Sequence, residues 1–162
     1  MTGTGDLRSR ALAALETVVD PEIPTLTIGD LGILRDVEVH GDAVAVVITP
    51  TYTGCPAMAM IALEIETALA RAGIAGHVRT SLAPAWTTDW LTDAARAKLA
   101  ASGIAPPGPA GSRRALFGED RPACPLCRSA DTERISEFGS TACKALYRCR
   151  ACREPFDAFK CH

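Results

Sequence analysis

The sequence predicts an α+β protein: a three-stranded mixed sheet covered by helices in the order αββαβα, followed by a small four-cysteine zinc-ribbon-like module. Two observations carry this prediction. Apolar residues recur at helical spacing in some segments and at alternate positions in others. A proline- and glycine-rich stretch then precedes two Cys-x-x-Cys pairs. We therefore expect a first domain over 1–103, a linker over 104–121 and a metal-binding domain over 122–162.

Composition excludes several classes of function. The chain has 162 residues and is 48% hydrophobic but only 5% aromatic, so an aliphatic core is expected. Residues 1–103 carry 7 Lys+Arg against 12 Asp+Glu, and residues 104–162 carry 10 against 7. An acidic body argues against nucleic-acid binding. No secretory leader and no apolar run of membrane-spanning length is evident, so we expect a cytoplasmic protein without a membrane partner.

The chain opens with a helix and an irregular loop. Pro21 is expected to end the helix, and the loop that follows contains two prolines and two glycines. Its acids, Asp20, Glu22 and Asp30, would cap helices or orient a partner, although turn chemistry on a solvated rim explains each of them singly. The apolar stripe that predicts the helix is Leu7, Ala11, Leu15 and Val18.

Three strands are expected to form the sheet. Alternation over 33–39 and 42–49 predicts a hairpin that turns at Gly41. A third strand is expected over 77–82, with Leu82 pointing inward. The sheet would have open edges, which favour dimerisation or the docking of a partner.

Two further helices are expected to cover the sheet. The longer one runs over 56–72 and ends at Gly73. Met60 and Leu63 are expected to widen its buried stripe, which consists of Met58, Ile61, Ile65 and Leu69. The last helix is expected to be capped by Thr88 or Asp89, since both residue types favour the N-cap position.

Cys55 stands where the second strand gives way to the long helix. Pro56 is tolerated at a first helical position, which places Cys55 near the N-cap. Free backbone N–H groups and the positive end of the helix dipole favour an anion there, a setting that lowers a thiol pKa and makes a nucleophile or a soft-metal ligand. The alternative is a buried cysteine that behaves as a small hydrophobe.

The strongest metal signal lies near the C-terminus. Cys124 and Cys127 form one Cys-x-x-Cys pair, Cys149 and Cys152 form another, and 21 residues separate the pairs. This spacing predicts a tetrahedral thiolate site that holds structural zinc or a rubredoxin-like iron. A module of this size has too small a core to fold alone, so the metal is expected to supply much of its stability.

Three further residues are candidate ligands. Cys143 is followed by Lys144, which would lower the pKa of the thiol. Cys143, Cys161 and His162 together would complete a second site. The alternative is a buried core thiol and a frayed terminus.

Part of the chain resembles a known family. Residues 7–103 resemble the small iron–sulfur assembly proteins that include SufT. That resemblance implies that Cys55 is the reactive cysteine, that a labile iron–sulfur cluster or iron is transferred there, and that Asp20, Glu22 and Thr53 assist. The motifs that carry it are Asp20-Pro21-Glu22-Ile23, Asp30-Leu31-Gly32-Ile33 and Thr53-Gly54-Cys55-Pro56.

Nearly the whole chain resembles a narrower group, the PaaD components of aerobic phenylacetate degradation. That system epoxidises the ring of phenylacetyl-CoA with a di-iron oxygenase and an iron–sulfur flavin reductase, so the resemblance implies an accessory protein without catalytic activity of its own. The chain indeed lacks the Glu-x-x-His and Gly-x-Gly-x-x-Gly motifs that such enzymes would use. The motifs that carry it are Pro84-Ala85-Trp86-Thr87-Thr88-Asp89-Trp90, Phe138-Gly139-Ser140-Thr141-Ala142-Cys143-Lys144 and Glu154-Pro155-Phe156-Asp157-Ala158-Phe159-Lys160-Cys161-His162.

Three functions remain open at this point. The first is delivery of iron or an iron–sulfur cluster through Cys55 to the reductase or oxygenase, with the cargo shared across a homodimer because one thiolate cannot hold a cluster. The second is a structural adaptor of the epoxidase complex, with zinc serving only folding. The third is electron transfer by iron in the four-thiolate ribbon.

Overall fold

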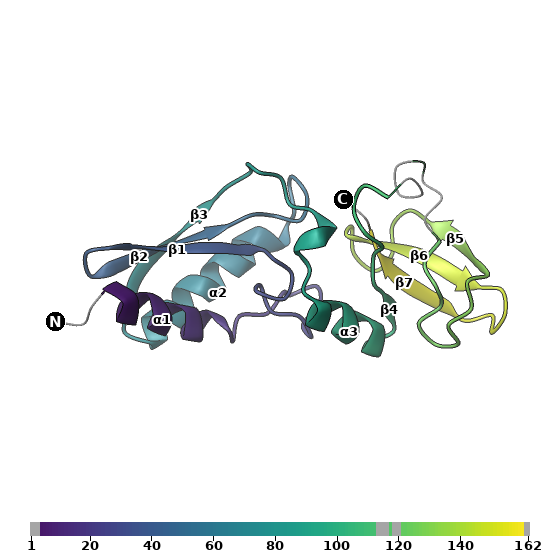
Figure 1. Ribbon diagram of the computed structural model, residues 1–162, viewed down its shortest axis with the longest axis horizontal. Helices are drawn as coiled ribbons and strands as arrows, with labels where there is room; N and C mark the ends of the chain where they lie inside the picture. Colours follow the sequence, from purple (N-terminus) through teal and green to yellow (C-terminus); the bar gives the residue numbers. More distant parts are fainter. Residues whose placement is uncertain (1–3, 113–116, 118–120, 161–162) are drawn as a thin grey trace. The chain divides into compact units, whose positions relative to one another are not determined.

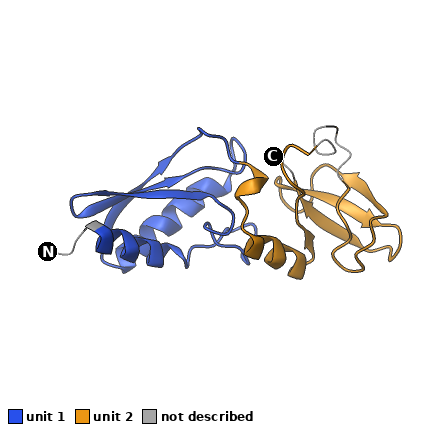
Figure 2. Ribbon diagram, viewed as in Figure 1, with its two compact units in different colours: residues 1–86 blue, residues 87–162 orange. Residues whose placement is uncertain are grey.

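The computed structural model describes residues 4–112, 117 and 121–160. The chain divides into two compact units, residues 1–86 and residues 87–162, coloured separately in Figure 2. In the described part of the chain, no helix combines the length and the apolar composition that a membrane span requires.

Unit 1 has the predicted order and sheet. It contains α1 (Thr4–Leu15), β1 (Leu34–His40), β2 (Ala43–Ile48), α2 (Ala57–Arg71) and β3 (Ala75–Thr80). The central strand β2 pairs antiparallel with β1 and parallel with β3, which makes the sheet mixed. Figure 1 shows both helices on one face of this sheet. The predicted α+β class is therefore confirmed.

The core of unit 1 lies between β2 and the helices. All of Val44–Ile48 is buried, and α2 turns Ile61, Ile65 and Leu69 inward. Helix α2 ends where Gly73, at φ 68°, lets the amide of Ile74 reach the carbonyl of Leu69 at 2.9 Å. The opposite face of the sheet is polar at its rims, where Arg79 of β3 donates to Glu38 of β1 at 2.6 Å.

Two expectations about burial in unit 1 are wrong. Met60 and Leu63 are 49% and 57% exposed, because helices cover only one face of the sheet and α2 needs no more than one narrow stripe. Strand β3 runs over Ala75–Thr80, so Leu82 lies beyond the end of the sheet and is 61% exposed.

Unit 2 combines a short helical segment with a four-stranded sheet. The elements are η1 (Thr88–Trp90), α3 (Asp93–Ala101), β4 (Ile104–Ala105), β5 (Thr132–Ser136), β6 (Lys144–Cys149) and β7 (Pro155–Phe159). The sheet order is β4-β7-β6-β5.

The N-cap of helix α3 differs from the expected one. Helix α3 is capped by Thr92, whose hydroxyl accepts the amide of Ala95 at 3.0 Å. The expected caps, Thr88 and Asp89, instead lie inside the short 3-10 turn η1, which Thr87 caps.

The compact units divide earlier in the chain than the expected domain boundary after residue 103. Helix α3 belongs to unit 2 because β4, at Ile104–Ala105, pairs in parallel with Asp157 and Ala158 of β7. The expected linker therefore begins with a strand of the ribbon sheet. The functional limits of the two domains, 1–103 and 122–162, stay a prediction.

Candidate functional site

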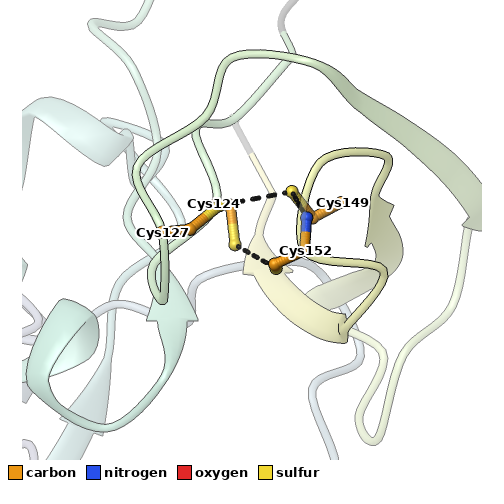
Figure 3. A group of neighbouring side chains, drawn as sticks. All are labelled: Cys124, Cys127, Cys149 and Cys152. Atoms are coloured by element: carbon orange, nitrogen blue, oxygen red, sulfur yellow. Dashed lines mark hydrogen bonds between the residues drawn. The ribbon is translucent and has the colours of Figure 1, made fainter.

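Four cysteine side chains of unit 2 lie close together (Figure 3). The Sγ atoms of Cys124, Cys127, Cys149 and Cys152 all lie within 4.8 Å of one another. Cys124 Sγ is 3.8 Å from Cys152 Sγ, and Cys127 Sγ is 3.5 Å from Cys149 Sγ. The sequence spacing thus brings together the four residues that it was expected to bring together.

These distances suit a metal and not a pair of disulfides. Zinc–sulfur bonds of about 2.3 Å in a tetrahedron give sulfur–sulfur edges of about 3.8 Å. A disulfide bond would need about 2.05 Å. Four sulfur ligands at this spacing would hold zinc or a single iron, both of which prefer tetrahedral thiolate sites.

The two Cys-x-x-Cys turns are built alike. Each is followed by an arginine with a positive φ, 64° at Arg128 and 68° at Arg153. The amide of Arg128 donates to the carbonyl of Cys124 at 2.9 Å, which closes the first turn. The left-handed backbone conformation of this arginine reverses the chain after the second cysteine of the pair. Both sulfurs of a pair therefore point toward the same ion.

Hydrogen bonds prepare one of the four thiols for deprotonation. The amide of Cys152 donates to Cys149 Sγ at 3.4 Å. Together with the amide of Ala151 and the neighbouring sulfurs, it lowers the pKa of Cys149 to about 6 against the opposing effect of burial. The amide of Glu154 also lowers the pKa of Cys152, but burial and the other three sulfurs raise that pKa to about 12. Metal ligands must be thiolates, so binding an ion here would release protons.

Cys55 lies in the loop between β2 and α2 and is partly buried. Its amide donates to the carbonyl of Tyr52 at 3.3 Å, and its own carbonyl accepts the amide of Met58 at 3.3 Å. Helix α2 begins at Ala57, with Pro56 as the N-cap residue. Cys55 therefore precedes the helix by one residue more than the sequence suggested.

The expected lowering of the thiol pKa at Cys55 is wrong in direction. Burial raises the pKa of Cys55, and the charges of Glu22 and Asp20 raise it further. The amide of Ala57 and the hydroxyl of Tyr52 lower the pKa but do not offset these effects. Pro56 supplies no N–H group, so the helix start offers the sulfur fewer donors than expected.

The acidic loop reaches the same neighbourhood. Asp20 is buried, and its Oδ1 accepts the amides of Glu22 at 2.7 Å and Ile23 at 2.9 Å. Thr53 is exposed in the loop that carries Cys55. Of the described residues, however, only the four ribbon cysteines form a group of three or more metal-ligating atoms within reach of one ion. The charges of Asp20 and Glu22 act on the thiol of Cys55, but the three residues do not form a chelating set.

Sequence reasoning missed Tyr52 as a partner of Cys55. The hydroxyl of Tyr52 lowers the pKa of the Cys55 thiol. The sequence signal that could have identified Tyr52 is its spacing, three residues before Cys55 in the same tight loop. The chain turns back on itself at Gly54, where φ is 82°.

Cys143 lies outside the four-sulfur group. Its side chain is buried, and Cys143 Sγ is 3.1 Å from the hydroxyl of Thr141. Cys161 and His162 lie outside the described residues, so the second metal site stays a prediction. The neighbouring Lys144 is buried, with its ammonium group 3.9 Å from Asp157 Oδ2.

Fold and site together define a protein with an iron–sulfur-assembly-type domain followed by a zinc β-ribbon. The family described as "Iron-sulfur cluster assembly protein" matches residues 8–81. The family described as "PaaD zinc beta ribbon domain" matches residues 108–160, which include all four sulfur ligands.

The chain belongs to the PaaD family. It is 51% identical over 150 residues to a putative subunit of 1,2-phenylacetyl-CoA epoxidase from Escherichia coli, and the match covers 92% of this chain and 90% of that protein. It is also 32% identical over 96 residues to the "Fe-S protein maturation auxiliary factor YitW" of Bacillus subtilis, covering 57% of this chain and 93% of that protein.

A solved structure supports the fold. A domain of unknown function (DUF59) from Bacillus anthracis superposes with a TM-score of 0.56 at 24% sequence identity, covering 59% of this chain and 93% of that chain. At this level of identity, the likeness supports the fold of the N-terminal part and carries no argument about activity.

Proposed function

We propose that this protein is an accessory factor of a phenylacetyl-CoA epoxidase system that delivers iron or an iron–sulfur cluster to the reductase or oxygenase component. Cys55 would be the sulfur ligand that receives the cargo, with Asp20, Glu22 and Thr53 around it. The observation that carries the proposal is the place of Cys55: a partly exposed thiol beside two carboxylates, on the domain that matches iron–sulfur assembly proteins.

The geometry favours transfer over storage. A single thiol that has no chelating partners among the described residues would hold a metal weakly. The missing ligands would come from the client or from a second copy of the chain, because a cluster needs about four protein ligands. Weak holding suits a factor that must release what it carries.

Zinc is proposed as the resident metal of the ribbon. The sulfur–sulfur distances fit it, and all four residues would bind it as thiolates. Zinc would supply folding energy to unit 2 and would not take part in redox chemistry.

The test compares wild type with Cys55→Ser. Both proteins are purified anaerobically and mixed with metal-free reductase, ferrous iron and a sulfide source, and the rate of reductase activation is followed. Wild type is expected to accelerate activation, and Cys55→Ser to lose that acceleration while keeping its zinc content. Glu66→Gln, an exposed change on α2, is the control and is expected to behave as wild type. Normal activation by Cys55→Ser refutes delivery through this thiol.

A structural adaptor is the second candidate, and the raised pKa of Cys55 favours it, because delivery would be better served by a thiolate. An adaptor would bind the oxygenase or reductase at a fixed ratio regardless of Cys55. Co-purification at that ratio, with full epoxidase activity in Cys55→Ser, would support it.

A further inference from the structure

A basic pocket lies beside the four sulfurs in unit 2. It has a volume of about 260 Å³ and is lined by Arg148, Cys149, Arg150 and Arg153. Arg148 precedes Cys149 in β6, and the other two arginines belong to the turn that carries the second cysteine pair. The backbone that presents two metal ligands therefore also presents three guanidinium groups.

Glu133 fixes two of the arginines. Arg148 donates to Glu133 Oε1 through Nε, at 2.9 Å, and through Nη2, while Arg150 donates to Oε2 through Nε at 3.2 Å and Nη2 at 2.9 Å. One carboxylate thus orients two guanidinium planes, and Arg150 also lies 3.8 Å from Asp131 Oδ1. Side chains held in this way lose little further freedom when they bind an anion.

Arg153 adds a cation that nothing in the described part of the chain pairs with an acid. Its backbone has φ 68°, a conformation that glycine adopts without strain and that other residues rarely adopt. Arg153 thus places a long cationic side chain at a position where glycine would cause less backbone strain. Arg128 has the same conformation in the first cysteine turn, so the backbone angle belongs to these turns, and the role proposed for Arg153 rests on its charge and its place in the pocket.

We propose that this pocket is a docking site for an acidic segment of a partner protein, which places a Glu or Asp carboxylate among Arg148, Arg150 and Arg153. Guanidinium groups bind carboxylates through paired N–H donors. This inference does not rest on Cys55 or on metal delivery, so it stands if the proposed function fails.

Two observations favour a protein over a small phosphorylated ligand. The pocket is smaller than the sites of about 300–1,000 Å³ that enclose whole ligands. Arginine is one of the residue types enriched at protein interfaces, and three arginines line this pocket.

The rival explanation is that the arginines only offset the negative charge of four thiolates around a divalent ion. It predicts that removing Arg153 weakens the hold on zinc. Docking predicts that removing Arg153 weakens the binding of an acidic peptide and leaves zinc in place. The two explanations are therefore separable with one variant and two measurements.

The experiment uses the zinc-loaded full chain and a decaglutamate peptide as probe. Binding is followed by NMR through the arginine Nε–H signals and by titration at two salt concentrations. We expect Arg153→Gln and Arg148→Gln to weaken binding by about five-fold or more. Arg134→Gln, the same charge change at an exposed residue of β5 that does not line the pocket, should stay within about two-fold. Added salt should weaken binding to wild type.

Four results would overturn the proposal. The first is an equal loss of peptide binding in Arg134→Gln, which would indicate diffuse charge attraction, and the second is loss of zinc from Arg153→Gln, measured by metal analysis. The third is tighter binding of inorganic pyrophosphate than of the peptide, followed at the same signals. The fourth is unchanged peptide binding in both pocket variants. Retained zinc with selective loss of peptide binding supports it.

Discussion

At the scale of single residues, the thiol of Cys55 is the feature on which the proposed activity depends. Its pKa is set by a balance in which burial and two carboxylates outweigh an amide and a tyrosine hydroxyl. The thiolate is the reactive form. A partner that excludes water from this loop, or that neutralises its carboxylates, would therefore change the pKa of the Cys55 thiol and with it the reactivity of the sulfur.

Replacing Glu22 by Gln should make Cys55 more reactive. Glu22 raises the pKa of this thiol, so removing its charge lowers that pKa and increases the thiolate fraction at pH 8. The measurement is the rate of iodoacetamide alkylation at Cys55 between pH 6.5 and 9.5, read by mass spectrometry of the zinc-loaded protein. In wild type, the rate should still be rising above pH 9.

Glu64→Gln is the matched control, because Glu64 is exposed on α2 and does not contribute to the thiol pKa. Equal rates in wild type and both variants would show that the acidic loop does not act on the sulfur.

Sequence reasoning succeeded at residues whose role follows from spacing alone. Two residues between cysteines suffice to place both sulfurs on one ion, and the four ribbon ligands were identified in this way. The direction of the pKa shift at Cys55 could not be identified, because it depends on how far the loop around Asp20 packs against the thiol. That packing joins segments more than 30 residues apart, and local pattern carries no information about it.

At the scale of elements, the contact between β2, β3 and α2 leaves no room for a side chain at Gly76. A Cβ there would lie 2.7 Å from Leu69 Cδ1 and 2.9 Å from the carbonyl oxygen of Val44. The parallel pairing places Gly76 opposite Val44, directly under the helix that Cys55 precedes. The packing of the C-terminal part of α2 on the sheet thus depends on the absence of a side chain at Gly76.

Gly76→Ala should destabilise unit 1 by about 1–3 kcal/mol, because the new methyl group must push apart a backbone and a buried leucine. Chemical denaturation followed by circular dichroism gives the free energy of unfolding. Gly5→Ala in α1 is the control, since nothing lies within 4 Å of its Cβ, and it should be neutral or slightly stabilising. Equal stability of the two variants would contradict the tight contact.

The periodicity of α2 predicted its buried stripe, Ile61, Ile65 and Leu69, and placed its end at Gly73. It did not predict that Met60 and Leu63 stay exposed. The width of a buried stripe depends on how many layers pack around a helix, and that number belongs to the tertiary structure.

At the scale of the whole molecule, the two units rely on different sources of stability. Unit 1 has a continuous aliphatic core, whereas unit 2 builds around a cluster that includes two of its own sulfur ligands, Cys124 and Cys149. Removing the metal from such a cluster would leave its former thiolate ligands to take up protons inside a small core.

A strong chelator should therefore unfold the ribbon and leave unit 1 folded. Two-dimensional NMR spectra recorded before and after chelation should lose the dispersed signals of β5, β6 and β7 and keep those of β1, β2 and β3. Cys149→Ser should give the chelated spectrum without chelator, and Cys143→Ser, outside the four-sulfur group, should keep the metal. Loss of all dispersed signals together would show that the units do not fold independently.

The unit boundary was beyond the reach of sequence patterns. Strand β4 has only two residues, and it joins the ribbon sheet by pairing with Asp157 and Ala158, more than 50 positions away. A stretch so short has no periodicity, and the prolines that follow it are typical of a linker. Only the pairing partner reveals the strand.

Strand β4 also bears on how the two halves can be separated experimentally. A fragment that starts at residue 122 would lack the strand that covers the outer edge of β7. Its backbone amides and carbonyls would then be open to pairing with other molecules, and such a fragment should aggregate even when saturated with zinc. A fragment starting at Thr87 retains that covering strand and is the better choice for biophysical work on the ribbon.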